Sequence, residues 1–217
     1  MEDTLQHSSD NRVAGGSRSK PFIFQQLDTT AKFPYPTSFY VKRVLWEVVQ
    51  ATLIRLSLRR AHGWRRFWLR VFGAKMHDTA MTKSSTNIKH PWLLEMGYFT
   101  VLAEDVVVYN LGPLWIGDHT VVSQNVHICN GTHDYTQPNL PLLRPTARIG
   151  HGVWICADAF IGPGVTVGDN SIVGARACVM RDVPPGVIVS GNPAKVVKER
   201  PMGGRPSGES SEPARTV

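Results

Sequence analysis

The stretch IGHGVWICADAFIGPGVTVGDNSIVGARACVMRDV, residues 149–183, decides the fold of this 217-residue chain. An aliphatic residue stands at every sixth position, and the residue after it is small in all but one repeat. A second small or β-branched residue follows four positions after each aliphatic one. The repeated aliphatic positions are Ile149, Ile155, Ile161, Val167, Val173 and Val179.

A period of six matches neither the 3.6-residue turn of an α-helix nor the two-residue alternation of a strand. It fits a chain that forms a short strand, turns at a small residue and repeats, so that three hexads close one triangular coil. Stacked coils then pair every strand with the coils above and below it. We therefore predict an all-β solenoid, a parallel β-helix. A β-sandwich, the alternative, would show turn signals at irregular spacing.

Earlier parts of the chain carry weaker versions of the same repeat. One run, in another register, comprises Ile116, Val122 and Ile128. Still earlier, degraded members of the repeat are Ile88, Leu94, Leu102 and Val108. The β-helix is accordingly expected over residues 76–198.

Residues 38–75 are the part of the chain with a helical pattern. Apolar residues recur there at steps of three and four, and basic residues follow them. We expect Gly63 to divide this segment into two helices and Gly73 to end the second. Residues 1–37 and 199–217 are rich in Gly, Ser, Pro and charge, and are predicted to be extended or disordered tails.

The net charge of +7 is concentrated in one segment. Residues 40–90 hold eleven Lys and Arg against two acids, whereas residues 91–190 hold four against eight. The basic residues of 40–75 are interleaved with aromatic ones. The segment is therefore interpreted as a helical cap on the first coil or as a contact with an anionic membrane surface. No motif for binding nucleic acid accompanies it.

Composition favours a cytoplasmic protein, with a peripheral contact to the inner face of the membrane as the alternative for its basic segment. The three cysteines, Cys129, Cys156 and Cys178, are widely spaced and form no CxxC pair, which argues against a disulfide framework. The polar, acidic N-terminal stretch is not a secretory signal, and no apolar run is long enough to span a bilayer.

The repeat is interrupted between Ile128 and Ile149, where residues 129–148 form a predicted loop with three prolines. His133 stands near the start of this loop, in the sequence NGTHDY. An isolated histidine is usually structural. Its place at the sharp interruption of a regular solenoid makes it a candidate for catalysis.

Several motifs resemble the hexapeptide-repeat acyltransferases. The chain is most similar to the maltose, galactoside and nodulation O-acetyltransferases, and within them to the colanic acid biosynthesis acetyltransferases. The motifs are LRVFGAK at 69–75, NLGP at 110–113, WIGD at 115–118, NGTHDY at 130–135, GVWI at 152–155, IGPGVTVGDNS at 161–171 and VPPGVIVSGNPAKVV at 183–197.

The resemblance implies a left-handed β-helix, a homotrimer, and acetyl-CoA bound in a groove between neighbouring prisms. His133 would act as the general base on a hydroxyl of a sugar or saccharide precursor, which attacks the thioester directly. Asp134 would contact the acceptor or orient a ring; alternatively it caps the turn of the loop. Asn110 is a further candidate for the acceptor site.

The resemblance also implies the residues that contact the cofactor. Small side chains let the pantetheine arm approach the backbone, and basic side chains meet the phosphates. Met180 stands where the sugar acetyltransferases carry a threonine that contacts CoA, so only the arginine after it keeps a polar role. The candidates are Trp154, Ala157, Ala175, Arg181, Lys195 and Lys198.

Two other functions fit the fold class. A zinc enzyme similar to the gamma-class carbonic anhydrases would need three converging histidines. The spacing of His119, His127, His133 and His151 does not reproduce that pattern, so no metal is expected. A scaffold without catalytic activity is the other alternative, and the presence of His133 together with Lys195 and Lys198 argues against it.

Overall fold

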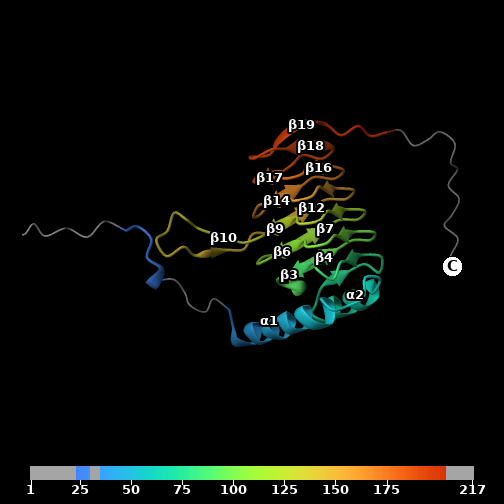
Figure 1. Ribbon diagram of the computed structural model, residues 1–217. Coiled ribbons are helices and arrows are strands. Elements are labelled where there is room, and N and C mark those ends of the chain that lie inside the picture. Colours follow the sequence, from blue (N-terminus) through green and yellow to red (C-terminus); the bar gives the residue numbers. More distant parts are fainter. Residues whose placement is uncertain (1–22, 30–34, 204–217) are drawn as a thin grey trace, which may run out of the picture.

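The computed structural model describes residues 23–29 and 35–203, and their strands form one parallel β-helix with helices at one end (Figure 1). The prediction of a left-handed parallel β-helix is confirmed. The predicted tails, 1–37 and 199–217, lie partly outside the described residues, because 1–22, 30–34 and 204–217 are not among them.

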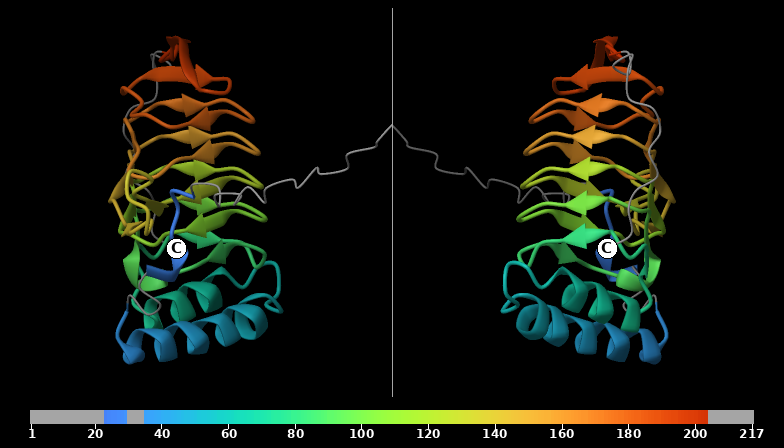
Figure 2. Two further views of the ribbon diagram at one scale, coloured as in Figure 1. Left: turned by 90° about the vertical axis from the view of Figure 1, so that its left-hand side faces the viewer. Right: turned by 90° about the vertical axis from the view of Figure 1, so that its right-hand side faces the viewer.

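The solenoid has three flat faces, each a stack of short strands that are parallel except for the last, β19, which pairs antiparallel with β18 (Figure 2). Face A comprises β1 (Lys75–Met76), β4 (Leu94–Met96), β7 (Leu114–Ile116), β12 (Ala147–Ile149) and β15 (Thr166–Val167). Face B comprises β2 (Met81–Thr82), β5 (Val101–Leu102), β8 (Val121–Val122), β13 (Trp154–Ile155), β16 (Ile172–Val173), β18 (Val187–Ser190) and β19 (Lys195–Glu199). Face C comprises β3 (Asn87–Ile88), β6 (Val107–Tyr109), β9 (His127–Cys129), β14 (Phe160–Ile161) and β17 (Cys178–Val179).

The core of the prism is the predicted set of repeated aliphatic side chains. All six aliphatic positions between Ile149 and Val179 are at most 1% exposed. Small residues occupy the corners because the coils approach closely there. A Cβ on Gly117 would lie 2.8 Å from the backbone of Gly150 in the next coil, so a larger residue would push the coils apart.

Coil length changes along the solenoid. Ile149 pairs with Val167, which closes a coil of three hexads. Met76 pairs with Met96, and Met96 with Ile116, so each of these earlier coils is longer by two positions. The additional positions enter between faces C and A. Consequently Met96, rather than Leu94, stacks beneath Ile116, and the hexad prediction was wrong by two positions at this point.

The corner between faces C and A also carries the long insertion. Ile116 pairs directly with Ile149, because residues 130–146, between β9 and β12, form an insertion here. Two short strands of the insertion, β10 (Thr132–His133) and β11 (Leu142–Leu143), pair as an antiparallel hairpin. Figure 1 shows this loop projecting from the side of the column. We call this edge of the prism the C–A corner.

Helices cover the first coil. They are α1 (Thr37–Val49), a π-helical turn η2 (Gln50–Ile54) and α2 (His62–Val71). Two short turns lie elsewhere: η1 (Leu27–Thr29) follows Gln26, whose N–H donates to the carbonyl of Pro138 in the loop, and η3 (Pro91–Leu93) lies within the solenoid. The expected division at Gly63 is wrong. The chain turns between Arg55 and Ala61, and Gly63 lies inside α2. The break falls earlier because η2 ends on a turn in which Ser57 bonds the carbonyl of Ile54.

Side chains of the helices donate hydrogen bonds to backbone carbonyls at the exposed edge of the first coil. Trp46 donates to the carbonyl of Ile88 at 2.7 Å on face C, and buried Arg65 donates to the carbonyl of Thr82 at 2.8 Å on face B. On face A, Arg70 donates to the carbonyl of Met76. These bonds pair strand-edge groups that would otherwise be exposed.

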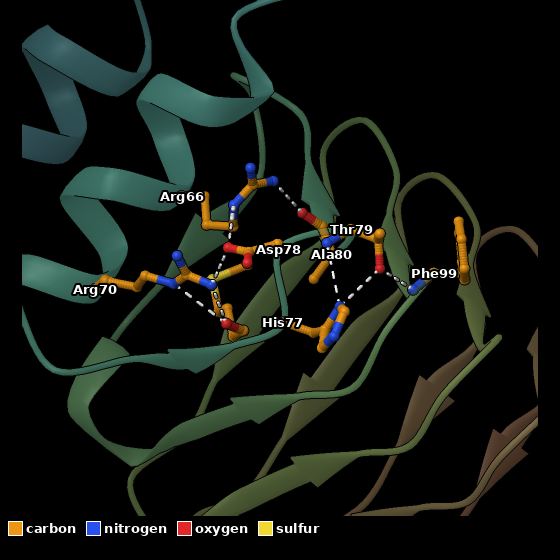
Figure 3. Close-up of polar contacts among 8 residues, drawn as sticks. Arg66, Arg70, His77, Asp78, Thr79, Ala80 and Phe99 are labelled. Atoms are coloured by element: carbon orange, nitrogen blue, oxygen red, sulfur yellow. Dashed lines mark hydrogen bonds and ion pairs between the residues drawn. The ribbon is translucent and has the colours of Figure 1, made fainter. Parts of the chain in front are cut away.

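A cluster of charged residues fastens α2 to the first turn (Figure 3). Arg70 and Arg66 both point at Asp78, and the Arg70 Nη2–Asp78 Oδ1 distance is 2.8 Å. Arg66 also donates to the carbonyl of Ala80. The Arg70 guanidinium lowers the pKa of the Asp78 carboxyl, chiefly through its hydrogen bond. The cluster is a docking contact between helix and coil.

Candidate active site

His133 lies on β10, at the base of the loop at the C–A corner, and its side chain is exposed. Its Nδ1 is 2.6 Å from the carbonyl oxygen of Leu140 across the hairpin. A carbonyl only accepts, so Nδ1 carries the proton and donates it. Nε2 then holds the lone pair. An imidazole fixed in this tautomer and open to its surroundings is suited to take a proton from a substrate.

Asp134 holds the loop in shape. Its carboxylate accepts hydrogen bonds from the backbone and hydroxyl of Thr136 at 3.0 and 2.6 Å, and from the amide of Gln137 at 2.9 Å. The side-chain bond from Thr136 is the main cause that lowers the pKa of Asp134. This arrangement favours the turn-capping role over direct contact with an acceptor.

A cavity of about 390 Å³ adjoins His133 at the C–A corner. We call it the corner cavity. Its walls come from the segment before α1, from α1 itself, from the two preceding turns of the corner and from the loop. Besides His133, the lining residues that carry chemistry are Tyr35, Arg43, Lys89, His90 and Tyr109.

Asn110 has a structural partner at this corner. Its side chain is fully buried, accepts from the backbone N–H of His90 at 2.9 Å and donates to the carbonyl of His90 at 2.8 Å. Its own carbonyl lies 2.9 Å from His90 Nδ1. Both polar ends of the Asn110 amide are therefore engaged with His90, and we do not retain Asn110 as an acceptor contact.

The predicted cofactor residues lie away from His133 within one protomer. Trp154 stands on face B, 47% exposed, and its indole N–H donates to Ser123. Ala157 and Ala175 are neighbours at the corner between faces B and C, where the N–H of Arg176 donates to the carbonyl of Ala157.

The basic candidates lie farther along the solenoid. Lys195 and Lys198 are exposed on β19, which pairs with β18 at the end of the column. Exposed Arg181 follows β17 at the C–A corner. One protomer does not bring these side chains and His133 to a single point.

The four histidines considered for zinc have separate surroundings. His119 stacks on Phe99, His127 packs against Phe160, and His151 lies 3.1 Å from Asp118. No cluster of three or more His, Cys, Asp or Glu side chains suited to a metal occurs among the described residues.

Comparison with known proteins identifies the family. A family model described as bacterial transferase hexapeptide (six repeats) matches residues 146–181. The acetyltransferase WcaF of Escherichia coli (strain K12), named for colanic acid biosynthesis, is 39% identical over 160 residues, which are 74% of this chain and 88% of that protein. The chain belongs to the hexapeptide-repeat acetyltransferases.

Solved structures of other hexapeptide-repeat acetyltransferases have the same fold. A maltose O-acetyltransferase from Clostridium difficile 630 matches with a TM-score of 0.68 and 25% identity, over 76% of this chain and 89% of that one. A hexapeptide-repeat acetyltransferase from Vibrio cholerae, solved with acetyl-CoA, matches with a TM-score of 0.69 and 25% identity, over 80% and 94%.

In this hexapeptide-repeat acetyltransferase four residues near His133 were not predicted from the sequence: His90, Lys89, Arg43 and Tyr35. A signal was present in the sequence. His90, Asn110 and Asn130 recur once per coil, each two positions after an inward-facing residue, and all three are buried. A search at the period of six alone does not find them, because the longer coils at this end of the solenoid are not a multiple of six.

Proposed function

We propose that this protein is an acetyl-CoA-dependent O-acetyltransferase that acts on a hydroxyl of a sugar or saccharide precursor, with His133 as general base. The observation that carries the proposal is the Nδ1–Leu140 hydrogen bond, which leaves Nε2 of an exposed imidazole free to accept a proton. The relatives named as acetyltransferases, one of them solved with acetyl-CoA, support the donor.

In the proposed reaction the acceptor hydroxyl gives its proton to Nε2 of His133 while its oxygen attacks the thioester carbonyl. The carbonyl carbon becomes tetrahedral and its oxygen takes the negative charge. When this intermediate collapses, the C–S bond breaks and the departing sulfur takes the proton from His133. The bond to the Leu140 carbonyl keeps the imidazole in one orientation and stabilises its charged form throughout.

We further propose that acetyl-CoA is bound along Trp154, Ala157, Ala175, Arg181, Lys195 and Lys198. The alanines leave the backbone of a corner accessible, and the lysines at the end of the column provide positive charge for phosphates. Because Trp154, the two alanines and the two lysines lie on other faces or corners of the prism than His133, the proposal requires a second protomer to complete the site.

A homotrimer fits the character of the three faces. Outward residues of face A are mostly charged or polar, namely Lys75, Glu95, Trp115, Arg148 and Thr166. Those of face B form an apolar column of Met81, Val101, Val121, Trp154, Ile172 and Ile188. Face C adds Val107, His127, Phe160 and Cys178. A closed ring needs two different contact faces on each protomer, and faces B and C supply them.

We also propose a cytoplasmic enzyme that rests on the inner face of the membrane through residues 40–75 and serves exopolysaccharide biosynthesis of the colanic acid type. None of the described helices is long and apolar enough to cross a bilayer. However, the side of α1 that faces away from the prism is apolar, with Val41, Val44, Leu45 and Val48 each 55–58% exposed.

The apolar surface continues beyond α1. In the turn after η2, Leu56 is 81% and Leu58 is 82% exposed, and α2 presents Trp64 and Phe67. Exposed Arg55, Arg59 and Arg60 lie in the same turn. Leu, Trp and Phe beside Arg are the residues that place a helix at the surface of an anionic membrane.

The test of the transferase proposal is release of free CoA thiol by the full-length protein against sugars, sugar phosphates and nucleotide sugars. His133→Ala should lower acceptor-dependent release by about 10²–10⁴-fold, the usual contribution of a general base, while acetyl-CoA binding measured by calorimetry persists. His77→Ala, which removes an exposed histidine from the first coil, is the matched control and should retain activity.

A protein that neither binds acetyl-CoA nor releases thiol with any acceptor would contradict the transferase proposal. The non-catalytic scaffold would then be the better explanation. Bound zinc in the purified protein, together with bicarbonate-forming activity, would favour the hydratase instead.

A further inference from the structure

The corner cavity carries more positive charge than its neighbours neutralise. Arg43 Nε and Lys89 Nζ lie 3.0 and 3.1 Å from the same oxygen, Oε1 of Glu47. No Asp or Glu is among the described residues that line the cavity itself. The two cations therefore share one carboxylate outside the lining, which leaves part of their charge available to a bound anion.

A third cation stands over the wall of the cavity. The guanidinium of exposed Arg144 lies 4.0 Å from the ring centroid of Tyr35, which is itself a lining residue. Stacking on the ring holds Arg144 at the entrance while its N–H groups stay free of any carboxylate among the described ion pairs.

His90 provides a buried polar atom in the same cavity. Only 1% of the residue is exposed, its Nδ1 bonds the carbonyl of Asn110, and its Nε2 has no hydrogen-bond partner among the described residues. Burial is the main cause that lowers the pKa of His90 to about 4, and Arg43, Lys89 and Arg144 lower it further. The neutral ring therefore adds no positive charge to the cavity wall, and the cations beside it provide the charge for a ligand.

The aromatic lining fits a sugar ring. Tyr109, 39% exposed, is the lining residue that can offer a ring to a ligand, since both faces of Tyr35 are covered, one by Phe39 with the ring centroids 4.0 Å apart and the other by Arg144. An aromatic face packs against the apolar side of a pyranose while hydroxyls and charged substituents turn to the polar side chains.

We propose that the corner cavity binds an oxyanion, a carboxylate or a phosphate, carried by the acceptor saccharide, with Arg43, Lys89 and Arg144 as its charge contacts. The inference deepens the proposed function, on which its place next to His133 rests. It makes the enzyme selective for anionic over neutral acceptors.

The test separates binding from turnover by using the full-length His133→Ala protein and titrating glucose, glucuronate and glucose 1-phosphate by calorimetry. We expect at least one charged sugar to bind ten-fold or more tightly than glucose, with an affinity that falls as salt rises. The uronate and the phosphate distinguish the two sources of the oxyanion.

Three variants in the His133→Ala background are expected to change the affinity for the charged sugar, two of them lowering it and one raising it. Lys89→Gln and Arg144→Gln should each weaken binding of the charged sugar several-fold. Glu47→Gln should strengthen it, because it releases Arg43 and Lys89 from their shared carboxylate. Lys75→Gln and Glu95→Gln remove a similar pair, 3.7 Å apart on face A, and should change nothing.

Equal binding of glucose and the charged sugars would overturn the inference, as would a Glu47→Gln variant that weakens binding as much as Lys89→Gln does. Folding of each variant is checked by its melting temperature. Charged sugars that bind as expected without any thiol release from the unsubstituted protein would uphold the cavity and reject the transferase.

Discussion

Two imidazoles of the same tautomer meet at one corner of this molecule and have different surroundings. His133 and His90 each donate from Nδ1 to a backbone carbonyl and keep Nε2 as an acceptor. His133 is exposed on a loop, whereas His90 is enclosed between coils. The exposed ring can exchange protons with a substrate, and the buried ring serves better as a fixed acceptor.

The buried ring makes stability depend on pH. Burial lowers the pKa of His90 to about 4, below the ordinary value of 6.5. As pH falls from 7 to 5, His90 becomes protonated in the unfolded chain but stays largely neutral in the folded chain. The free energy of unfolding therefore decreases. The contribution is fully present above pH 6.5 and disappears toward pH 4, by at most about 1.4 kcal/mol per pH unit.

We therefore expect His90→Gln to flatten the fall in urea midpoint between pH 7 and pH 5, measured at one protein concentration. Carboxylates with lowered pKa values, such as that of Asp78, titrate below this window. His77→Gln, an exposed control, should keep the full slope. An unchanged slope in His90→Gln would show that other groups carry the dependence; the pKa values of half-buried His62 and His127 shift in the same direction.

At the scale of elements, α1 is apolar on both sides. Its inner side places Trp46 against the first coil, and its outer side exposes Val41, Val44, Leu45 and Val48. The apolar periodicity visible in the sequence largely belongs to the outer side. The cap and the proposed membrane contact, which the sequence offered as alternatives, would therefore use opposite sides of the same helix and would not compete.

The outer side predicts binding to anionic vesicles. Sedimentation with phosphatidylglycerol vesicles should capture the protein, and phosphatidylcholine should capture less of it. Leu56→Glu, at a position 81% exposed, should reduce capture several-fold because it adds like charge and removes apolar contact. Met202→Glu, at a residue 63% exposed that follows β19 in the chain, is the control. Equal capture of both variants would count against the membrane contact.

At the scale of the whole molecule, the three faces differ in what they expose. The in-register stacking of coils turns one outward position of each coil into a continuous column, so six apolar residues gather on face B. A column of this kind favours burial against a second protomer. The proposed active site depends on that assembly, since His133 and the proposed cofactor residues lie on different parts of one prism.

The trimer is tested by sedimentation. The unsubstituted protein should sediment at about three times the chain mass of 24.1 kDa. Ile172→Arg, in the column on face B, should give monomers and abolish thiol release, because a charge buried at the interface would lack a partner. Arg148→Glu on face A should remain trimeric. A trimer that tolerates Ile172→Arg would contradict the assignment of face B to the interface.

Sequence alone was enough to establish the β-helix, its inward aliphatic positions from Ile149 to Val179 and the interruption that contains His133. The reason is local. Inside a narrow prism every sixth side chain has the same environment, so a six-residue repeat in the sequence is enough to predict which side chains are buried. The interruption of that period likewise marks the loop without knowledge of any distant contact.

The proximity of His90, Asn110 and the loop with His133 at the C–A corner became clear from the three-dimensional structure and not from the sequence. His90 and Asn110 belong to successive coils, and the loop with His133 follows another coil later, so their proximity depends on the register of the stack. The face that α1 buries was also undetermined, because apolar residues occur on both of its sides. The single-coil pattern specifies which residues point inward; the stacking of coils and helices specifies which of the outward ones come together to form a site.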